Sequence, residues 1–180
     1  MSKLGKKIIV LPKDSKVAVQ GNILTISGPK GSETLSFNDK IFSSKVNEKN
    51  EFHILPINKK DKNVSVMWGT YRSLINNAVI GVSSGHEKIL ELNGVGFRAN
   101  LKGDVLNLQI GFSHDVNFPI PEGVKIVVEK QTIIKITGSD KQLIGSIAAK
   151  IKSFKKTEPY KGKGIKEQGE YILRKEGKKK

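Results

Sequence analysis

Residues 17–28 read VAVQGNILTISG, an alternation of apolar and polar residues interrupted by Gly21-Asn22. Alternation with a period of two predicts strands with one buried face, and a Gly-Asn pair between two such runs predicts a tight hairpin turn. Residues 99–111 read ANLKGDVLNLQIG and have the same pattern around Gly103-Asp104. The two stretches therefore predict one hairpin in each half of the chain.

A second alternating stretch follows the first in both halves. Residues 45–55 (KVNEKNEFHIL) turn near Lys49-Asn50, and residues 125–136 (KIVVEKQTIIKI) turn near Lys130-Gln131. Polar residues that accept turn conformations separate β-branched and aromatic runs here, which predicts two further hairpins.

Each half then changes from a strand period to a helical one. In the first half, apolar residues recur at intervals of three and four, with Gly81 as a stop signal; they are Val64, Met67, Trp68, Tyr71, Leu74, Ile75, Ala78 and Val82. In the second half, Ser139 and Gln142 have the spacing of a capping box. The apolar positions that follow it are Leu143, Ile144, Ile147, Ala148, Ile151 and Phe154.

The common order of hairpin, hairpin and helix predicts an internal repeat. We expect an α+β protein of two similar small domains, each an antiparallel sheet with a packed helix, plus a basic C-terminal tail. The predicted ranges are 1–82, 83–156 and 157–180, with residues 82–86 joining the domains. Matched positions are offset by about 82 residues at the start and about 76 at the end, although residues 17–28 also align with residues 126–138.

The charge is concentrated at the two ends of the sequence. The 180 residues carry a net charge of +15, with five basic and one acidic residue in 1–16 and twelve basic and four acidic in 150–180. Such clusters predict an anionic partner. Only three of the 32 basic residues are arginines, which favours phosphate contacts over forked recognition of base edges.

Composition also excludes several classes of site. The chain has no cysteine, which removes thiolate nucleophiles, disulfides, Fe–S clusters and sulfur-ligated zinc. The apolar run of residues 8–11 is too short for a secretory signal, and no stretch reaches the ~18 apolar residues of a membrane span. We therefore expect a soluble, intracellular protein.

Three motifs carry weaker alternatives. Residues 94–99 (GVGFRA) fit a dinucleotide fingerprint, but the alternation after Gly96 predicts a strand where that fingerprint needs a helix. Residues 28–31 (GPKG) have the spacing of the nucleotide-clamping loop of KH domains, yet lie between strand-like runs, so an inter-strand turn is the better interpretation, with Lys30 able to touch phosphate. The histidines at 53, 86 and 114 form no zinc motif, and the pair His114-Asp115 lacks a nucleophile motif.

The stretch KKTEPYKGKGIK at residues 155–166 is the most informative. Pro159 ends the preceding helix, the glycines allow the backbone to approach a partner closely, and an aromatic residue among lysines can pack on a base or sugar. The predicted RNA-binding residues are Lys155, Lys156, Tyr160, Lys161, Gly162, Lys163, Gly164 and Lys166. The alternative is a flexible basic linker.

Within this stretch, residues 158–165 (EPYKGKGI) resemble the C-terminal signature of the bacterial-type large-subunit ribosomal proteins of the universal family L-six. The resemblance covers nearly the whole chain, through residues 2–7 (SKLGKK), 28–31 (GPKG), 69–77 (GTYRSLINN), 94–98 (GVGFR), 111–114 (GFSH) and 140–143 (DKQL). Thr157 and Glu167-Gln168 depart from the family pattern.

The resemblance implies two similar α+β domains and a non-enzymatic, structural role in translation. It also implies binding to large-subunit rRNA near the factor-binding region, the stalk base and the sarcin–ricin loop, mainly through the C-terminal domain and tail. The expected partners are this rRNA and neighbouring ribosomal proteins near the stalk base, with one copy per large subunit and no cofactor, metal or membrane. The expected location is the cytoplasmic ribosome, with an organelle matrix as the alternative. A nicotinamide-dependent enzyme and a general binder of DNA or anionic membrane are the competing functions.

Overall fold

The computed structural model describes residues 2–47, 50–58 and 61–176. Contacts divide the chain into two compact units, one of residues 1–85 with 139–141 and one of residues 86–138 with 142–180. Each unit is described by itself below.

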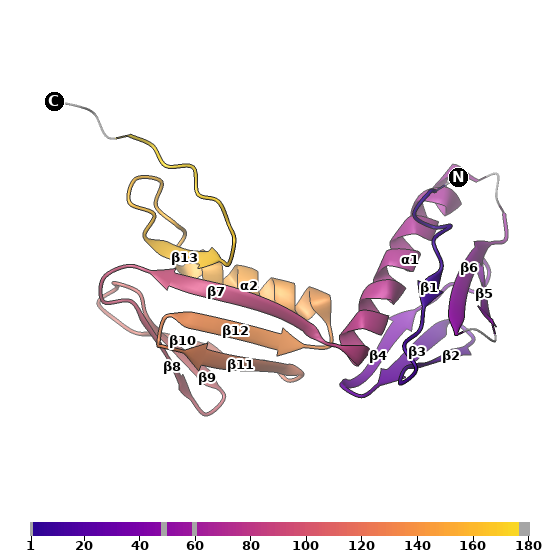
Figure 1. Cartoon of the computed structure of the whole chain (residues 1–180), viewed down its shortest axis with the longest axis horizontal. Coiled ribbons are helices and arrows are strands. Elements are labelled where there is room, and N and C mark those ends of the chain that lie inside the picture. Colours follow the sequence, from indigo (N-terminus) through magenta and orange to yellow (C-terminus); the bar gives the residue numbers. More distant parts are fainter. Residues whose placement is uncertain (1, 48–49, 59–60, 177–180) are drawn as a thin grey trace. The chain divides into compact units, whose positions relative to one another are not determined.

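The first unit contains two antiparallel sheets and a long helix (Figure 1). One sheet has the order β2-β3-β4 and the other the order β1-β6-β5, and α1 packs against β3, β4 and β6. The elements are β1 (Ile9–Val10), β2 (Lys16–Gln20), β3 (Ile23–Gly28), β4 (Gly31–Ser36), β5 (Phe42–Asn47), β6 (Glu51–Pro56) and α1 (Lys62–Ser83).

The second unit repeats this plan with one additional strand. Its sheets have the orders β10-β9-β8 and β11-β12-β7-β13, all neighbours antiparallel. Figure 1 shows α2 lying along the four-stranded sheet. The elements are β7 (His86–Asn93), β8 (Arg98–Lys102), β9 (Val105–Gln109), β10 (Val116–Pro119), β11 (Val124–Glu129), β12 (Ile133–Gly138), α2 (Lys141–Phe154) and β13 (Gly164–Glu167).

The predicted α+β repeat is confirmed in element order, but two details were wrong. Each unit has two sheets instead of one. In each unit a third strand extends the first hairpin into one sheet, and a strand from earlier in the chain joins the second hairpin in the other sheet. The predicted tail is also not wholly a tail, since Gly164–Glu167 pairs with β7. The strand starts of β2, β3, β5 and β6 precede those of β8, β9, β11 and β12 by the same offset, so the alignment of residues 17–28 with 126–138 is wrong.

The four predicted hairpin turns lie where the sequence placed them. Gly21 and Gly103 have φ of +56° and +58°, values that glycine adopts without strain. Lys130 and Gln131 have φ of +52° and +60°, and Asn50 has +56°, although the neighbouring residues 48–49 lie outside the described part of the chain. Local turn chemistry therefore fixed these pairings.

The helix ends differ from the prediction by a few residues. Gly81 is buried inside α1 and is not its stop signal; the helix ends at Ser83, and Gly85 follows with φ +82° while its N–H donates to the Ile80 carbonyl. A left-handed glycine just past a helix is the usual way to satisfy its last carbonyls. In the second unit α2 begins at Lys141, so Asp140, not Ser139, directly precedes it.

The GPKG turn joins β3 to β4, as the inter-strand interpretation predicts. The Lys30 N–H donates to the Val82 carbonyl at 2.9 Å, and its ammonium donates to the Ser84 carbonyl at 2.5 Å. The negative C-terminal end of the α1 dipole stabilises a cation at this position. Lys30 therefore has a structural contact of its own, distinct from the phosphate contact considered above.

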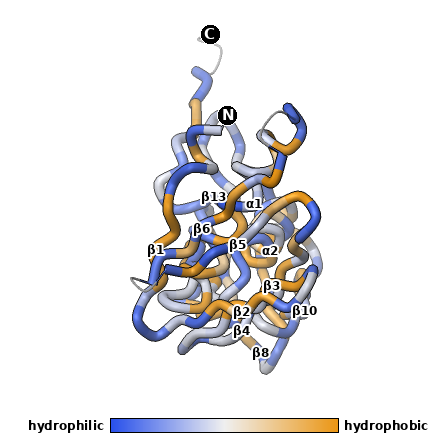
Figure 2. Tube along the Cα trace, turned by 90° about the vertical axis from the view of Figure 1, so that its right-hand side faces the viewer, coloured by the Kyte–Doolittle hydropathy of each residue, from blue (hydrophilic) through white to orange (hydrophobic). Residues whose placement is uncertain are grey.

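Each unit has its own hydrophobic core. In the first, the Trp68 indole N–H donates to the Ile54 carbonyl at 2.8 Å, so the polar edge of a buried ring is satisfied. In the second, Ile144, Ile147 and Ile151 of α2 are at most 2% exposed, each contributing about 1.5–3 kcal/mol. Met67, predicted on the buried face of α1, is 38% exposed. Figure 2 shows the alternation of hydrophobic and hydrophilic residues along the chain.

Candidate nucleic-acid interface

The basic segment after α2 folds into a closed loop. The Glu158 N–H donates to the Lys163 carbonyl at 2.7 Å, and the Gly162 N–H donates to the Glu158 carbonyl at 3.0 Å. The Lys175 N–H also donates to the Pro159 carbonyl at 2.9 Å. These bonds hold residues 158–163 in a fixed shape, which the flexible-linker alternative does not predict.

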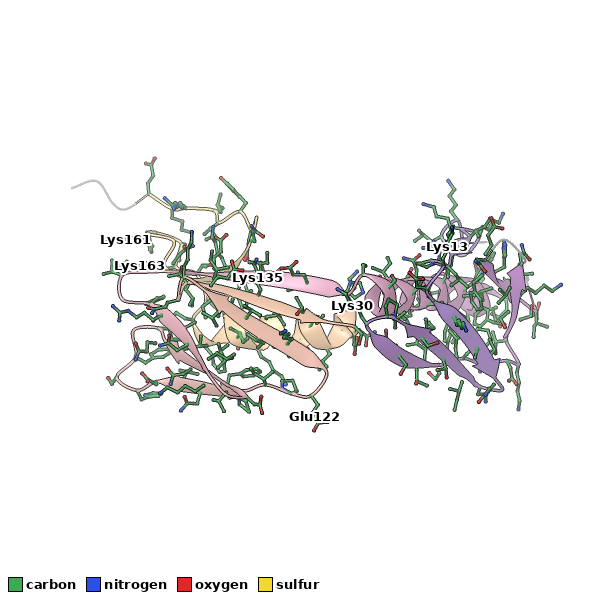
Figure 3. All side chains as sticks on the ribbon, turned by 60° about the horizontal axis from the view of Figure 1, so that its bottom comes forward. Lys13, Lys30, Glu122, Lys135, Lys161 and Lys163 are labelled. Atoms are coloured by element: carbon green, nitrogen blue, oxygen red, sulfur yellow. The ribbon has the colours of Figure 1, made fainter. Side chains whose placement is uncertain are left out.

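The loop presents three of the predicted residues to solvent. Tyr160 is 55% exposed, and Lys161 and Lys163 are exposed on either side of buried Gly162 (Figure 3). Among the described residues, neither of these lysines forms an ion pair. The loop therefore presents two exposed lysines that form no ion pair among the described residues, beside an accessible aromatic ring.

The remaining predicted lysines have different surroundings. Lys156 is exposed, whereas Lys155 is half-buried with its ammonium 4.8 Å from the centroid of the Phe112 ring. The ammonium of Lys166 lies 2.9 Å from a carboxylate oxygen of Glu91, so its charge is largely compensated. Lys156, Lys161 and Lys163 are thus exposed and form no ion pair among the described residues. Lys155 and Lys166, in contrast, contact other side chains of the protein.

The two predicted glycines contact the chain itself. Gly164 is buried at φ +137°, and a Cβ there would lie 2.7 Å from both the Lys156 carbonyl oxygen and the Thr157 Cα. At Gly162, with φ +70°, a Cβ would approach the Arg174 guanidinium at 3.4 Å. The sequence predicts that these glycines allow close approach to RNA, but in the structure their missing side chains shape the loop.

Carboxylates anchor the segment to the rest of the unit. Glu167 pairs with Lys88 at 2.5 Å, and Glu170 pairs with Lys152 at 2.6 Å and accepts the Glu167 N–H at 3.0 Å. The hydrogen bond from Lys152, followed by that from the Glu167 N–H, lowers the pKa of Glu170. Glu167 and Glu170 therefore dock the segment, while Lys161 and Lys163 of the loop remain exposed.

One further basic residue lies at the same end of the sheet. Because Gly164 pairs with Asn93, the loop 158–163 and the turn after β7 lie at one end of the β7–β13 pair. The Leu92 N–H donates to the Thr132 carbonyl, which brings the Lys130-Gln131 turn to this end as well. Lys130 is exposed, so it adds positive charge near the loop.

Sequence reasoning missed one feature of this region, the rings of Phe112 and His114. Their centroids are 6.0 Å apart and their planes differ by 13°, so the rings are stacked. Phe112 is 45% exposed and His114 is exposed. An aromatic residue directly after Gly111, in a turn between two alternating runs, was the available signal.

The structure also bears on the competing motifs. Arg98–Lys102 forms strand β8 directly after the GVGF turn, so no helix N-terminus exists there to hold a pyrophosphate. Within residues 2–47, 50–58 and 61–176, no group of three or more His, Asp or Glu side chains could hold a metal ion. In the same ranges no helix is both long and apolar enough to span a membrane.

Comparison with known proteins gives a consistent result. The model of the family described as Ribosomal protein L6 matches residues 11–85 and 93–168, one range in each repeat. Proteins named large ribosomal subunit protein uL6 are 46% identical over 180 residues in Novosphingobium aromaticivorans, covering all of both chains, and 48% identical over 178 residues in Staphylococcus carnosus, covering 99% of this chain and 98% of that one. The same-named protein of Sphingopyxis alaskensis is 46% identical over the full length of both chains. Two matched repeats and full-length identity of this size establish that the chain belongs to the Ribosomal protein L6 family.

Proposed function

We propose that this chain binds large-subunit rRNA near the factor-binding region and the stalk base, through the loop 158–163 and the lysines beside it. It is a ribosomal protein of the large subunit, found with the cytoplasmic ribosome, and its role is structural and not enzymatic. The location on the subunit rests on the family resemblance, and the choice of surface rests on the geometry of the loop.

The observation that supports this surface most strongly is a hydrogen-bonded loop that carries exposed lysines without ion-pair partners among the described residues. Two backbone hydrogen bonds close the turn that carries Lys161 and Lys163. The backbone of the loop is therefore already ordered, and little backbone conformational entropy is lost when these lysines contact phosphates. In this proposal Lys155, Lys156, Lys161, Lys163 and Lys166 contact phosphates and Tyr160 packs on a sugar or base. Gly162 and Gly164 contribute by shaping the loop.

The ion pairs of the segment set an order among these lysines. Lys166 shares its charge with Glu91, and Lys155 lies over Phe112, whereas Lys156, Lys161 and Lys163 have no carboxylate partner among the described residues. Release of counterions from phosphates is largest for cations that are not already neutralised. We therefore assign the largest contribution to the last three.

The test is the salt dependence of binding to a large-subunit rRNA transcript. In a plot of log affinity against log salt, each lost phosphate contact reduces the slope by about 0.7–0.9, so the double variant Lys161→Ala/Lys163→Ala should flatten it by about 1.4–1.8. The control is Lys45→Ala/Lys125→Ala, which removes two exposed lysines outside both basic clusters and should leave the slope nearly unchanged. Equal slopes for both double variants would overturn the assignment of this surface.

Two further measurements address location and competing functions. Chemical probing of the rRNA should show protection in the factor-binding region when the protein is bound, and sedimentation after a salt wash should retain about one copy per large subunit. Neighbouring ribosomal proteins near the stalk base should cross-link to the bound chain. Equal affinity for duplex DNA of the same length would instead support a general polyanion binder.

A further inference from the structure

A cluster of three side chains in the second unit lies outside the hydrophobic core. Phe112 and His114 stack at 6.0 Å with 13° between their planes, and the Lys155 ammonium lies 4.8 Å from the Phe112 centroid. Phe112 and His114 come from the turn between β9 and β10, whereas Lys155 directly follows α2. Two segments far apart in the sequence thus combine in one exposed arrangement of two rings and a cation.

The core does not require this arrangement. Phe112 is absent from the core cluster of its unit and leaves 45% of its surface exposed. Its position is nevertheless fixed, since Gly111 has φ +77° and a Cβ there would lie 3.2 Å from the ring of Phe97, which is 9% exposed. A buried ring thus holds the turn that presents an exposed one.

A backbone hydrogen bond connects the cluster to the RNA-binding loop. The Ile165 N–H donates to the Lys155 carbonyl at 2.9 Å, and Ile165 is fully buried in β13, directly after the loop. The lysine beside the rings is therefore tied to the strand that positions Lys161 and Lys163.

We propose that Phe112 and His114 form a stacking platform for an unpaired nucleobase of the bound rRNA, with Lys155 close enough to meet an adjoining phosphate. This inference rests on the proposed function and adds the class of ligand group that this part of the surface takes. Every nucleobase has a flat π-face, so a splayed base can extend the stack of these two exposed, nearly parallel rings without requiring a particular sequence. A cation beside the rings adds attraction for the backbone of the same nucleotide.

The experiment compares Phe112→Leu with Phe112→Trp in binding of the full chain to the large-subunit rRNA transcript. Loss of a base stack weakens binding by about 5- to 150-fold, and because no charge is removed, the slope against log salt stays unchanged. The tryptophan variant keeps a flat ring and should bind like the wild type. Thermal unfolding of each variant shows whether a loss of affinity comes from a loss of fold.

Irradiation at 254 nm supplies a readout at residue level, because a stacked base forms a zero-length cross-link. A nucleotide adduct on the peptide containing residues 112–114 is expected, and it should disappear in a variant with Phe112→Leu and His114→Ala. If the wild type binds with a steep salt dependence while Phe112→Leu binds equally well and no adduct forms, the platform is refuted and the proposed function stands. If the wild type itself shows no salt-dependent binding, the proposed function fails as well.

Discussion

Replacing Gly164 by alanine should detach strand β13 from its sheet. A non-glycine residue at φ +137° costs about 1–3 kcal/mol in backbone strain. The new Cβ would lie 2.7 Å from backbone atoms of Lys156 and Thr157, and overpacking of this kind adds about 1–3 kcal/mol. Backbone atoms cannot rotate away as a side chain would, so one of the two segments has to move.

The free energy needed to detach β13 from β7 is the upper limit to the destabilisation that Gly164→Ala can cause. Detachment exposes Ile165, worth about 1.5–3 kcal/mol, and breaks backbone hydrogen bonds worth about 0.5–1.5 kcal/mol each. The released residues regain about 1–2 kcal/mol each of conformational entropy, which offsets much of that loss. Detachment is therefore cheaper than tolerating the clash, and we expect the free energy of opening at β13 to fall by about 2–4 kcal/mol.

Amide hydrogen exchange measures this directly. Protection of the Ile165 and Gln168 amides, which donate to the Lys155 and Ile89 carbonyls, should fall roughly 30- to 700-fold. The Leu92 amide donates to Thr132 on the other side of β7 and should stay protected. The matched control is Gly169→Ala, where φ is +80° but no atom lies within 4 Å of the Cβ position. Similar protection in the two variants would refute the steric argument.

Two other predictions concern single polar contacts. Glu170→Gln should destabilise the protein by about 1 kcal/mol or less near pH 7, since the Lys152 and Glu167 hydrogen bonds lower the pKa of Glu170 in the folded chain. The carboxylate stabilises the fold fully above its ordinary pKa of 4.5, and this contribution is lost as pH falls through the lowered value. In urea unfolding, the difference between wild type and variant should therefore be larger at pH 7 than at pH 3. Trp68→Phe should leave the Ile54 carbonyl without its buried donor and cost about 1–3 kcal/mol, measured by exchange of α1 amides; unchanged exchange would contradict this.

Much of the fold followed from the sequence because its signals are local. Gly21-Asn22 and Gly103-Asp104 lie between alternating runs, and each turn needs only its neighbouring residues to form. The predicted end of α1 was wrong because local signals do not distinguish two nearby glycines. Gly81 and Gly85 are both near the end of the apolar pattern, and only the backbone conformation separates them. Propensity alone does not separate a buried helical glycine from a terminal one.

The parts that sequence reasoning missed depend on contacts between distant residues. β13 is four residues long and becomes a strand only because Gly164–Glu167 meets β7. The pairing of Lys166 with Glu91 and the position of Lys155 over Phe112 join residues that no local pattern connects. The segment proposed to bind RNA could be selected from the sequence, whereas the division of its lysines between docking contacts and exposed positions required the structure.

The pairing of β13 with β7 also has a consequence for how the protein matures. β13 lies C-terminal to every other strand of its sheet, so it is the last to leave the ribosome that synthesises the chain. Until it docks, β7 presents an unpaired edge and the loop before β13 lacks the anchor that fixes its shape. A chain interrupted before Gly164 would thus have an aggregation-prone edge and would lack the fixed loop that we propose to bind RNA. The order of the strands makes the completion of synthesis a condition for forming the interface.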